Sequence, residues 1–267
     1  MMKVDRYKCA HVSLKSFLEP QIPSFDEIND KILATIEECK ENDIKCIFLE
    51  VSQNYANVLG FAVQQGFNFH HVSDDSLCLT KKLKPANIPN YATHQVGGGA
   101  LVLTKDLKRV LMVQEKNGQL QNMWKPPTGK VELGEKIGEG ICREVFEETN
   151  VKGEFIGIVG YRERFPWIYG LNDIYFVGIM IAESEDSQMD TEEIARVRWF
   201  ELDEYTSLSN KEKIFPVYKQ IINKIKQCSA IDEIRKLCLV ETELDYSDFN
   251  QKGYMFLSSA IFDDKSQ

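Results

Sequence analysis

Five glutamates on one short segment form the part of this sequence best suited to chemistry. They are Glu135, Glu139, Glu144, Glu147 and Glu148. In the same segment the apolar residues Ile137, Ile141 and Val145 recur every four positions, which is the spacing of an amphipathic helix. The segment therefore predicts a helix whose carboxylates lie at the edge of a buried face.

Three of these glutamates, Glu144, Glu147 and Glu148, fall within an arc of roughly 100° on that helix. Like charges at such spacings oppose helix formation by roughly 0.2–0.5 kcal/mol per pair, and burial beside apolar side chains adds a desolvation cost. A divalent cation would offset both costs. Carboxylates are hard oxygen ligands, and no Cys or His lies at ligand spacing here, so Mg²⁺ or Mn²⁺ is favoured over zinc.

The alternative is an ordinary solvated acidic face, which is common on glutamate-rich helices. The flanking residues argue against it. Residues 125–129 (KPPTG) form a rigid, turn-forming segment, Gly134 stands just before the helix, and Asn150 follows it at a position that tolerates left-handed backbone. The pattern indicates a loop, helix, loop unit that places the carboxylates.

This unit resembles the signature of the Nudix hydrolases. The residues that match in register are Gly129, Glu135, Arg143, Glu144, Val145, Glu147, Glu148 and Val151. Asn150 stands where the family has its second glycine, and we expect the turn to form because Asn is the next-best residue at positive φ. The resemblance implies an α+β chain with the Nudix α/β/α sandwich, and hydrolysis of a pyrophosphate that joins a nucleoside to another moiety.

The same resemblance implies roles for these residues. The Mg²⁺ or Mn²⁺ would be held by Glu144, Glu147, Glu148 and the backbone carbonyl of Gly129, with Glu147 and Glu148 also acting in catalysis. Arg143 and Glu135 would orient the carboxylates rather than touch the substrate.

Three further stretches, residues 66–71, 91–97 and 171–177, resemble one branch of the family. It is the branch of the plant ADP-ribose/NADH pyrophosphatases and the animal antisense basic fibroblast growth factor protein. The resemblance runs from about residue 43 to about residue 205. It implies ADP-ribose or NADH as substrate with release of AMP, and a small N-terminal α/β domain that looks like part of an acetyltransferase fold. Coenzyme A, dinucleoside polyphosphates and capped RNA ends stay open, because the signature does not distinguish them.

The general base is either a signature glutamate or a glutamate from a later loop. Glu192 and Glu193 are the later candidates, and we prefer Glu193 as a base or auxiliary metal ligand, because the family has a Glu-Ile at this place. The alternative is that residues 191–194 only cap a turn.

Aromatic and basic residues between 161 and 169 are the candidates for binding the nucleoside end of the substrate. Arg162 and Arg164 suit a phosphate, and an aromatic ring such as Trp167 suits adenine. The other aromatic residues of this loop are Tyr161, Phe165 and Tyr169. The alternative is that these aromatic residues serve only packing.

Composition limits the partners. The net charge of −9 argues against DNA and other polyanions, whereas a small nucleotide bound through a metal is compatible with it. Seven cysteines without a CxxC pair favour reduced thiols, and no apolar run is long enough to span a membrane. We expect a cytoplasmic protein; a nuclear or mitochondrial location and a homodimer both stay open.

The chain length predicts two units. We expect an N-terminal α/β domain at residues 1–84, a linker at 85–93, a Nudix domain at 94–226 and a C-terminal extension of unknown role at 227–267. The N-terminal domain begins with a helix from Ser24 to Lys40, with Ser24 and Glu27 as a capping box. His70 and His71 are neighbours on a predicted strand, so they should face opposite sides and not chelate one ion.

The remaining helices and strands are expected at helix 55–65 and at strands 45–51, 67–72, 77–83, 95–103, 109–114, 153–161, 172–181 and 197–200, with a polar helix starting at Leu202.

Two other functions compete with hydrolysis. A weakly active or inactive Nudix-fold binding or regulatory protein is the first, although the intact acidic pairs argue against a dead site. The second, acyl transfer, needs a glycine-rich loop that opens a helix. The helix after the 45–51 strand opens with residues 52–55 (SQNY), which contain no glycine, so we reject acyl transfer.

Overall fold

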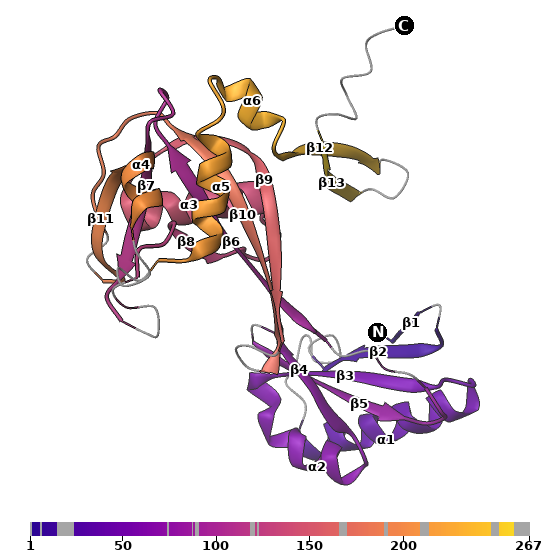
Figure 1. Cartoon of the computed structure of the whole chain (residues 1–267). Helices are drawn as coiled ribbons and strands as arrows, with labels where there is room; N and C mark the ends of the chain where they lie inside the picture. Colours follow the sequence, from indigo (N-terminus) through magenta and orange to yellow (C-terminus); the bar gives the residue numbers. More distant parts are fainter. Residues whose placement is uncertain are drawn as a thin grey trace, which may run out of the picture. The chain divides into compact units, whose positions relative to one another are not determined.

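The computed structural model divides into two compact units, Met1–Thr93 and His94–Gln267 (Figure 1). The residues that it describes are 2–5, 7–14, 24–73, 75–86, 88, 91–117, 121, 123–165, 170–189, 192–208, 214–246 and 251–258. Among them, no helix combines the length and the apolar character that crossing a membrane requires. All seven cysteines carry free thiols.

The first unit is a mixed sheet with helices on one face (Figure 1). Its strands lie in the order β1-β2-β3-β5-β4, and β2 is parallel to β3 while the other neighbours are antiparallel. The elements are β1 (Lys3–Val4), β2 (Cys9–Ser13), α1 (Phe25–Glu41), β3 (Cys46–Ser52), the 3-10 helix η2 (Gln53–Val58), α2 (Leu59–Gln64), β4 (Asn68–Ser73) and β5 (Ser76–Lys82).

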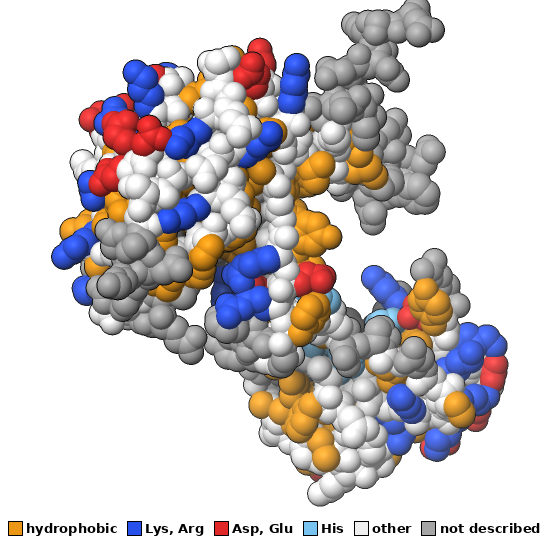
Figure 2. Space-filling view, viewed as in Figure 1, with side chains coloured by type: hydrophobic (Ala, Val, Ile, Leu, Met, Phe, Trp, Pro, Cys, Tyr) orange, Lys and Arg blue, Asp and Glu red, His pale blue; other side chains and the backbone are white. Residues whose placement is uncertain are grey.

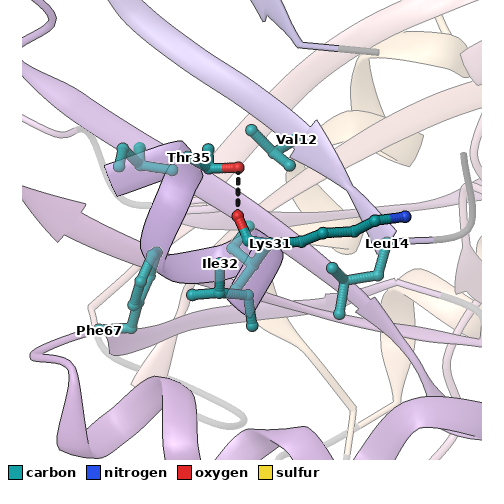
Figure 3. A pocket seen from close by; sticks show the side chains of 8 residues that line it. Val12, Leu14, Lys31, Ile32, Thr35 and Phe67 are labelled. Atoms are coloured by element: carbon teal, nitrogen blue, oxygen red, sulfur yellow. Dashed lines mark hydrogen bonds between the residues drawn. The ribbon is translucent and has the colours of Figure 1, made fainter. Parts of the chain in front are cut away.

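Helix α1 begins as the sequence predicts. The Ser24 hydroxyl accepts from the Glu27 backbone N–H, and the Glu27 carboxylate accepts from the Ser24 backbone N–H. One face of α1 then packs Ile32 and Ile36 onto the sheet. Figure 3 shows a small cavity between α1 and the sheet near Phe67. Its volume of about 10 Å³ has room for no more than about one water molecule, so it is a packing defect and not a ligand site.

The second unit is built on a larger sheet with strand order β11-β7-β6-β10-β9-β12-β13, and β8 pairs with β6 off this path. Strand β6 is parallel to β10, and β10 is antiparallel to β9. The strands are β6 (His94–Leu103), β7 (Arg109–Glu115), β8 (Thr128–Lys130), β9 (Gly153–Arg164), β10 (Asn172–Ala182), β11 (Ile194–Glu201), β12 (Leu239–Tyr246) and β13 (Gln251–Ser258). The helices are α3 (Ile137–Thr149), α4 (Leu202–Ser207), α5 (Pro216–Ile225) and α6 (Ile231–Arg235).

Helices cover both faces of this sheet, as the alternation along β6 requires. Ala100 and Val102 point to the face where α3 packs Ile141 and Val145, whereas Leu101 and its neighbours point to the face covered by α4, α5 and α6. Figure 1 shows α3 and α5 on opposite sides of the sheet. The expected α+β architecture with a helix, sheet, helix sandwich is therefore present.

The structure also departs from the expected elements. The first unit opens with strands β1 and β2 rather than with a helix, and the predicted helix at 55–65 is a 3-10 turn followed by the short α2. Part of the C-terminal extension belongs to the second unit, because Ile234 of α6 and Cys238 lie in the core cluster with α5. The expected limits of the linker and of the extension stay predictions.

Candidate active site

The signature segment folds as a loop, helix, loop unit. Gly134 has φ +82° just before α3, and Asn150 ends the helix in the left-handed conformation, with φ 58° and its N–H donating to the Phe146 carbonyl at 2.7 Å. Both residues occupy positions that an ordinary side chain disfavours. The expectation that Asn150 preserves the turn is confirmed.

Glycine on β6 allows α3 to lie close to the sheet. A Cβ atom on Gly98 would lie 2.7 Å from a side-chain carbon of Ile141, which is below normal contact distance. Gly98 also pairs with Gly129 on β8. The two glycines thus bring α3, β6 and β8 together, and the carboxylates of α3 reach the backbone of β8.

Glu144 lies over the backbone of Gly129. A Cβ atom on Gly129 would overlap the carboxylate of Glu144, so only glycine leaves room for this arrangement. The backbone N–H of Lys130 donates to Glu144 Oε1 at 3.1 Å and fixes the carboxylate in place. This contact brings the carboxylate of Glu144 to the backbone of Gly129, whose carbonyl is the expected metal ligand.

Glu148 is the most deeply placed carboxylate of the cluster, and only 6% of the residue is exposed. Its Oε2 accepts from the Thr128 backbone N–H at 2.9 Å. Burial raises the pKa of Glu148 to about 7, and the positive charge of Lys125 and the Thr128 N–H limit that rise. Glu148 is therefore a carboxyl group that titrates near neutral pH.

Arg143 binds the other carboxylates from one side. Its guanidinium donates to both carboxylate oxygens of Glu135, at 2.8 and 3.0 Å, which is a bidentate pair. It also donates to Glu144 at 3.0 Å and to Glu147 at 2.9 Å, and it donates to the Lys130 carbonyl at 2.9 Å. One arginine thus fixes three carboxylates, while Glu139 pairs with Lys136 at 3.8 Å.

Lys125 is a buried cation, whereas the sequence indicated only that it belongs to a turn. The residue is 3% exposed, and its Nζ lies 2.9 Å from Glu115 Oε1 and donates to Thr128 Oγ1 at 2.7 Å. Its charge also lowers the pKa of Glu148, opposing the effect of burial. Lys125 therefore supports both the β8 backbone and the ionised form of Glu148. A lysine before two prolines was its only signal in the sequence.

A cleft of about 650 Å³ connects these groups. Its lining includes Gly129, Arg143, Glu144, Glu147 and Glu148 together with Glu193. Glu193 is exposed just before β11, and its carbonyl accepts from the Lys116 N–H at 2.8 Å. Glu135 does not line the cleft itself, but it accepts a hydrogen bond from Arg143, which does. The predicted catalytic, metal and orienting residues thus lie together, and Glu193 joins them from a segment distant in the sequence.

Two of the predicted substrate-binding residues, Arg162 and Arg164, lie at the C-terminal end of β9 and are not among the described residues that line this cleft. Arg162 is about half exposed, lies 3.5 Å from Asp173 Oδ2 and stacks over the ring of Tyr175 at 4.7 Å. Burial raises the pKa of Tyr175, and the charges of Arg162 and Glu148 act on that pKa in opposite directions. Arg164 is exposed. Trp167 and Tyr169 lie outside the described residues, so the structure says nothing of their part.

The donor set fits a hard divalent cation. The convergent groups are carboxylate oxygens and the peptide backbone of residues 128–130, which are the ligand types that Mg²⁺ and Mn²⁺ prefer. Arg143 already pairs with Glu135, Glu144 and Glu147, yet Glu148 still carries a raised pKa. A cation at this place would stabilise its ionised form.

Comparisons with known proteins agree with this geometry. A model described as the NUDIX domain matches residues 93–224, and one described as the Nudix hydrolase domain matches residues 1–83. The chain is 30% identical to Nudix hydrolase 7 of Arabidopsis thaliana, covering 83% of this chain and 79% of that protein. It is 32% identical to the human nucleoside diphosphate-linked moiety X motif 6, covering 68% of this chain and 58% of that protein.

The structure is also similar to that of a MutT protein from Methanosarcina mazei, with a TM-score of 0.42 and 18% identity over 52% of this chain and 97% of that one. The sequence matches together cover both units. The chain therefore belongs to the Nudix hydrolase family and is a pyrophosphohydrolase of that family.

Proposed function

We propose that this enzyme hydrolyses the pyrophosphate of a nucleoside diphosphate linked to another moiety, with ADP-ribose or NADH as substrate and AMP as a product. The observation that carries the proposal is the convergence of Glu144, Glu147 and Glu148 with the Gly129 backbone on one cleft. The resemblance of residues 66–71, 91–97 and 171–177 to the ADP-ribose/NADH branch supports the choice of substrate.

Each group has a distinct part in this proposal. Glu144, Glu147 and Glu148 would hold Mg²⁺ or Mn²⁺, and the bound ion would neutralise the charge of the diphosphate and make it easier for water to attack. Arg143 keeps the carboxylates of Glu135, Glu144 and Glu147 in place through the hydrogen bonds described above. Because its guanidinium is already engaged by them, we assign it to positioning and not to the substrate.

Glu193 is the preferred general base. It is exposed to solvent and lines the cleft with the metal carboxylates, so it can accept a proton from an attacking water. Glu147 and Glu148 are the alternatives from the signature, but their carboxylates are assigned to the metal. Glu193→Gln should therefore lower kcat and change Mn²⁺ affinity by no more than about twofold. Glu147→Gln should lower both kcat and Mn²⁺ affinity.

The nucleoside end is assigned to the outer part of β9 and the loop after it. Arg162 offers a half-exposed guanidinium held by Asp173 and Tyr175, and Arg164 and Trp167 lie further along the chain. A phosphate or carboxylate would find a preorganised partner at Arg162. Arg162→Ala should raise KM more than it lowers kcat.

The test is product analysis with the full chain. Purified enzyme is incubated with ADP-ribose, NADH, coenzyme A and a dinucleoside polyphosphate, each with Mg²⁺, with Mn²⁺ and with chelator. Metal-dependent AMP release from ADP-ribose or NADH that is lost in Glu147→Gln supports the proposal. Preference for another substrate in the panel overturns the substrate assignment, and no metal-dependent turnover at all favours the binding or regulatory protein instead.

A further inference from the structure

Two histidines and a cysteine converge on the first unit, far along the chain from the signature. They are His70 and His71 on β4 and Cys78 on β5. Their ligand atoms all lie within 4.8 Å of one another, and His70 Nδ1 lies 2.7 Å from His71 Nδ1. The expectation that these histidines face opposite sides of the strand is therefore wrong.

The physical reason is a bulge in β4. The register of β4 against β5 shifts between Phe69 and His71: Phe69 lies opposite Leu79, and His71 lies opposite the adjacent residue Cys78. A bulge breaks the two-residue alternation of a strand and turns neighbouring side chains toward the same side. The two imidazole rings consequently lie with their centroids 4.9 Å apart.

The surroundings hold these rings in place. Tyr91 stacks on His71 with ring centroids 3.9 Å apart, and Phe48 lies edge-on to His70 at 5.5 Å. Glu50 lies opposite Cys78 on the neighbouring strand β3. Ile47 and Leu49 of β3 point to the helix-covered core, so Phe48 and Glu50 belong to the other face of the sheet. The cluster is thus on the face that α1 and α2 leave uncovered.

The protonation states suit metal binding once the cysteine loses its proton. Burial, with a contribution from His70, lowers the pKa of His71, so its ring is neutral at neutral pH. Burial and then the charge of Glu50 raise the pKa of Cys78 to about 11. A thiol in this state is a poor redox nucleophile but becomes a thiolate ligand when a metal displaces its proton.

We propose that His70, His71 and Cys78 form a binding site for a single zinc-like transition-metal ion. Imidazole and thiolate are the ligands that Zn²⁺ selects over Mg²⁺. Tetrahedral Zn²⁺ with bonds of about 2.0–2.3 Å sets its ligand atoms roughly 3.3–3.8 Å apart. The two imidazole nitrogens, at 2.7 Å, would have to separate slightly, and ligand atoms that lie up to 4.8 Å apart would have to approach by about 1 Å. Three protein ligands leave one position for water or for Glu50.

This site is separate from the carboxylate cleft in sequence and in ligand chemistry. The cleft offers hard oxygens, whereas the cluster offers nitrogen and sulfur. The ion would join β4 to β5 and, through the stack of Tyr91 on His71, fix the end of the first unit. The site does not depend on the substrate assignment, so each can fail without the other.

The test measures metal binding to the full chain in excess Mg²⁺, the ion proposed for the carboxylate cleft. After chelation and dialysis the protein is titrated with Zn²⁺, and Co²⁺ is used as a spectroscopic probe of thiolate ligation. The wild type should bind one equivalent of Zn²⁺, show a thiolate-to-Co²⁺ absorption band and melt at a higher temperature with Zn²⁺. Glu148→Gln should behave in the same way, because it alters only the cleft.

Variants of the cluster should lose this behaviour. Loss of a residue that only hydrogen-bonds to a metal ligand costs about 10–100-fold in metal affinity. Cys78→Ser and His71→Ala each remove a ligand, so each should weaken Zn²⁺ binding by at least about tenfold. Cys78→Ser should also remove the Co²⁺ band. The matched control is Cys9→Ser, a similarly buried thiol on β2 of the same sheet, and it should keep both signals.

Far-UV circular dichroism of the metal-free proteins checks that the variants fold. His71 is only half-buried, so His71→Ala remains informative even where Cys78→Ser does not fold. Absence of a tight Zn²⁺ equivalent from the wild type overturns the proposal. So does an equivalent that persists unchanged in both cluster variants.

Discussion

Glu148→Gln should raise the free energy of unfolding of the metal-free second unit at alkaline pH, relative to the wild type, and should have little effect on it at acid pH. The folded-state pKa of Glu148 is about 7, against an ordinary value of 4.5. Between these values the folded chain keeps a proton that the unfolded chain releases. The free energy of unfolding therefore falls as pH rises, and above pH 7 the full cost of the buried charge is present.

The shift corresponds to about 3.4 kcal/mol at about 1.4 kcal/mol per pKa unit. About 0.8 kcal/mol of the cost is already present at pH 5, so the stability difference between Glu148→Gln and wild type should change by about 2.5 kcal/mol between pH 5 and pH 8. The amide keeps an oxygen that can accept from the Thr128 N–H.

The assay is urea unfolding in chelator followed by tryptophan fluorescence. All three tryptophans, at positions 124, 167 and 199, belong to the second unit, so the signal is specific for it. Glu139→Gln is the control, because Glu139 is an exposed carboxylate on the same helix. If the difference between Glu148→Gln and wild type is the same at both pH values, the buried, charge-sensitive role of Glu148 is wrong.

Three further substitutions test the supports of the site. Gly129→Ala should lower Mn²⁺ affinity and turnover at least about tenfold, because its Cβ would displace the Glu144 carboxylate; unchanged kinetics would contradict that contact. Lys125→Met should cost about 2 kcal/mol in urea unfolding and move the acid limb of the pH–rate profile to higher pH, because Glu148 loses a charge that lowers its pKa. An acid limb that stays in place would disprove the link to Lys125. Asn150→Gly should stabilise by about 0.5 kcal/mol without affecting turnover, since φ is 58° there; marked destabilisation would show that the Asn side chain is needed.

Much of this architecture follows from local patterns in the sequence. The four-residue repeat of Ile137, Ile141 and Val145 predicted α3, and Ser24 with Glu27 predicted the start of α1, because both depend on contacts within a few residues. The carboxylates were recognisable for the same reason. Because of their spacing, the carboxylates lie on one side of α3, so they line the same cleft once α3 packs on the sheet.

The features that the sequence did not predict depend on contacts between residues distant in the sequence, or on how deeply a side chain is buried. Strand β2 is defined by its parallel pairing with β3, from which it is separated in the sequence by α1. Strand β8 has only three residues, which is too short for a pattern to indicate it. The burial of Lys125 and the raised pKa of Glu148 depend on how the chain closes around them. The bulge at His70 breaks the alternation from which a strand is predicted.

The charge distribution leaves the partner prediction unchanged. On the face shown in Figure 2, the Lys and Arg side chains of the described residues are scattered among acidic and neutral ones within each unit, and those described side chains form no continuous basic stripe there. A stripe of that kind is the usual footprint of a nucleic-acid binder. The prediction of a small nucleotide substrate rather than DNA therefore stands as a prediction, as does a homodimer.

The most direct experiment asks whether the α3 carboxylates hold the metal on which hydrolysis depends. Free Mn²⁺ is measured by electron paramagnetic resonance in titrations of wild type, Glu147→Gln and Glu139→Gln, and AMP release is measured on the same samples. We expect Glu147→Gln to weaken Mn²⁺ binding at least about tenfold and to lower turnover at least about 100-fold, whereas Glu139→Gln should match the wild type. Equal Mn²⁺ affinity and turnover in all three proteins would contradict this expectation.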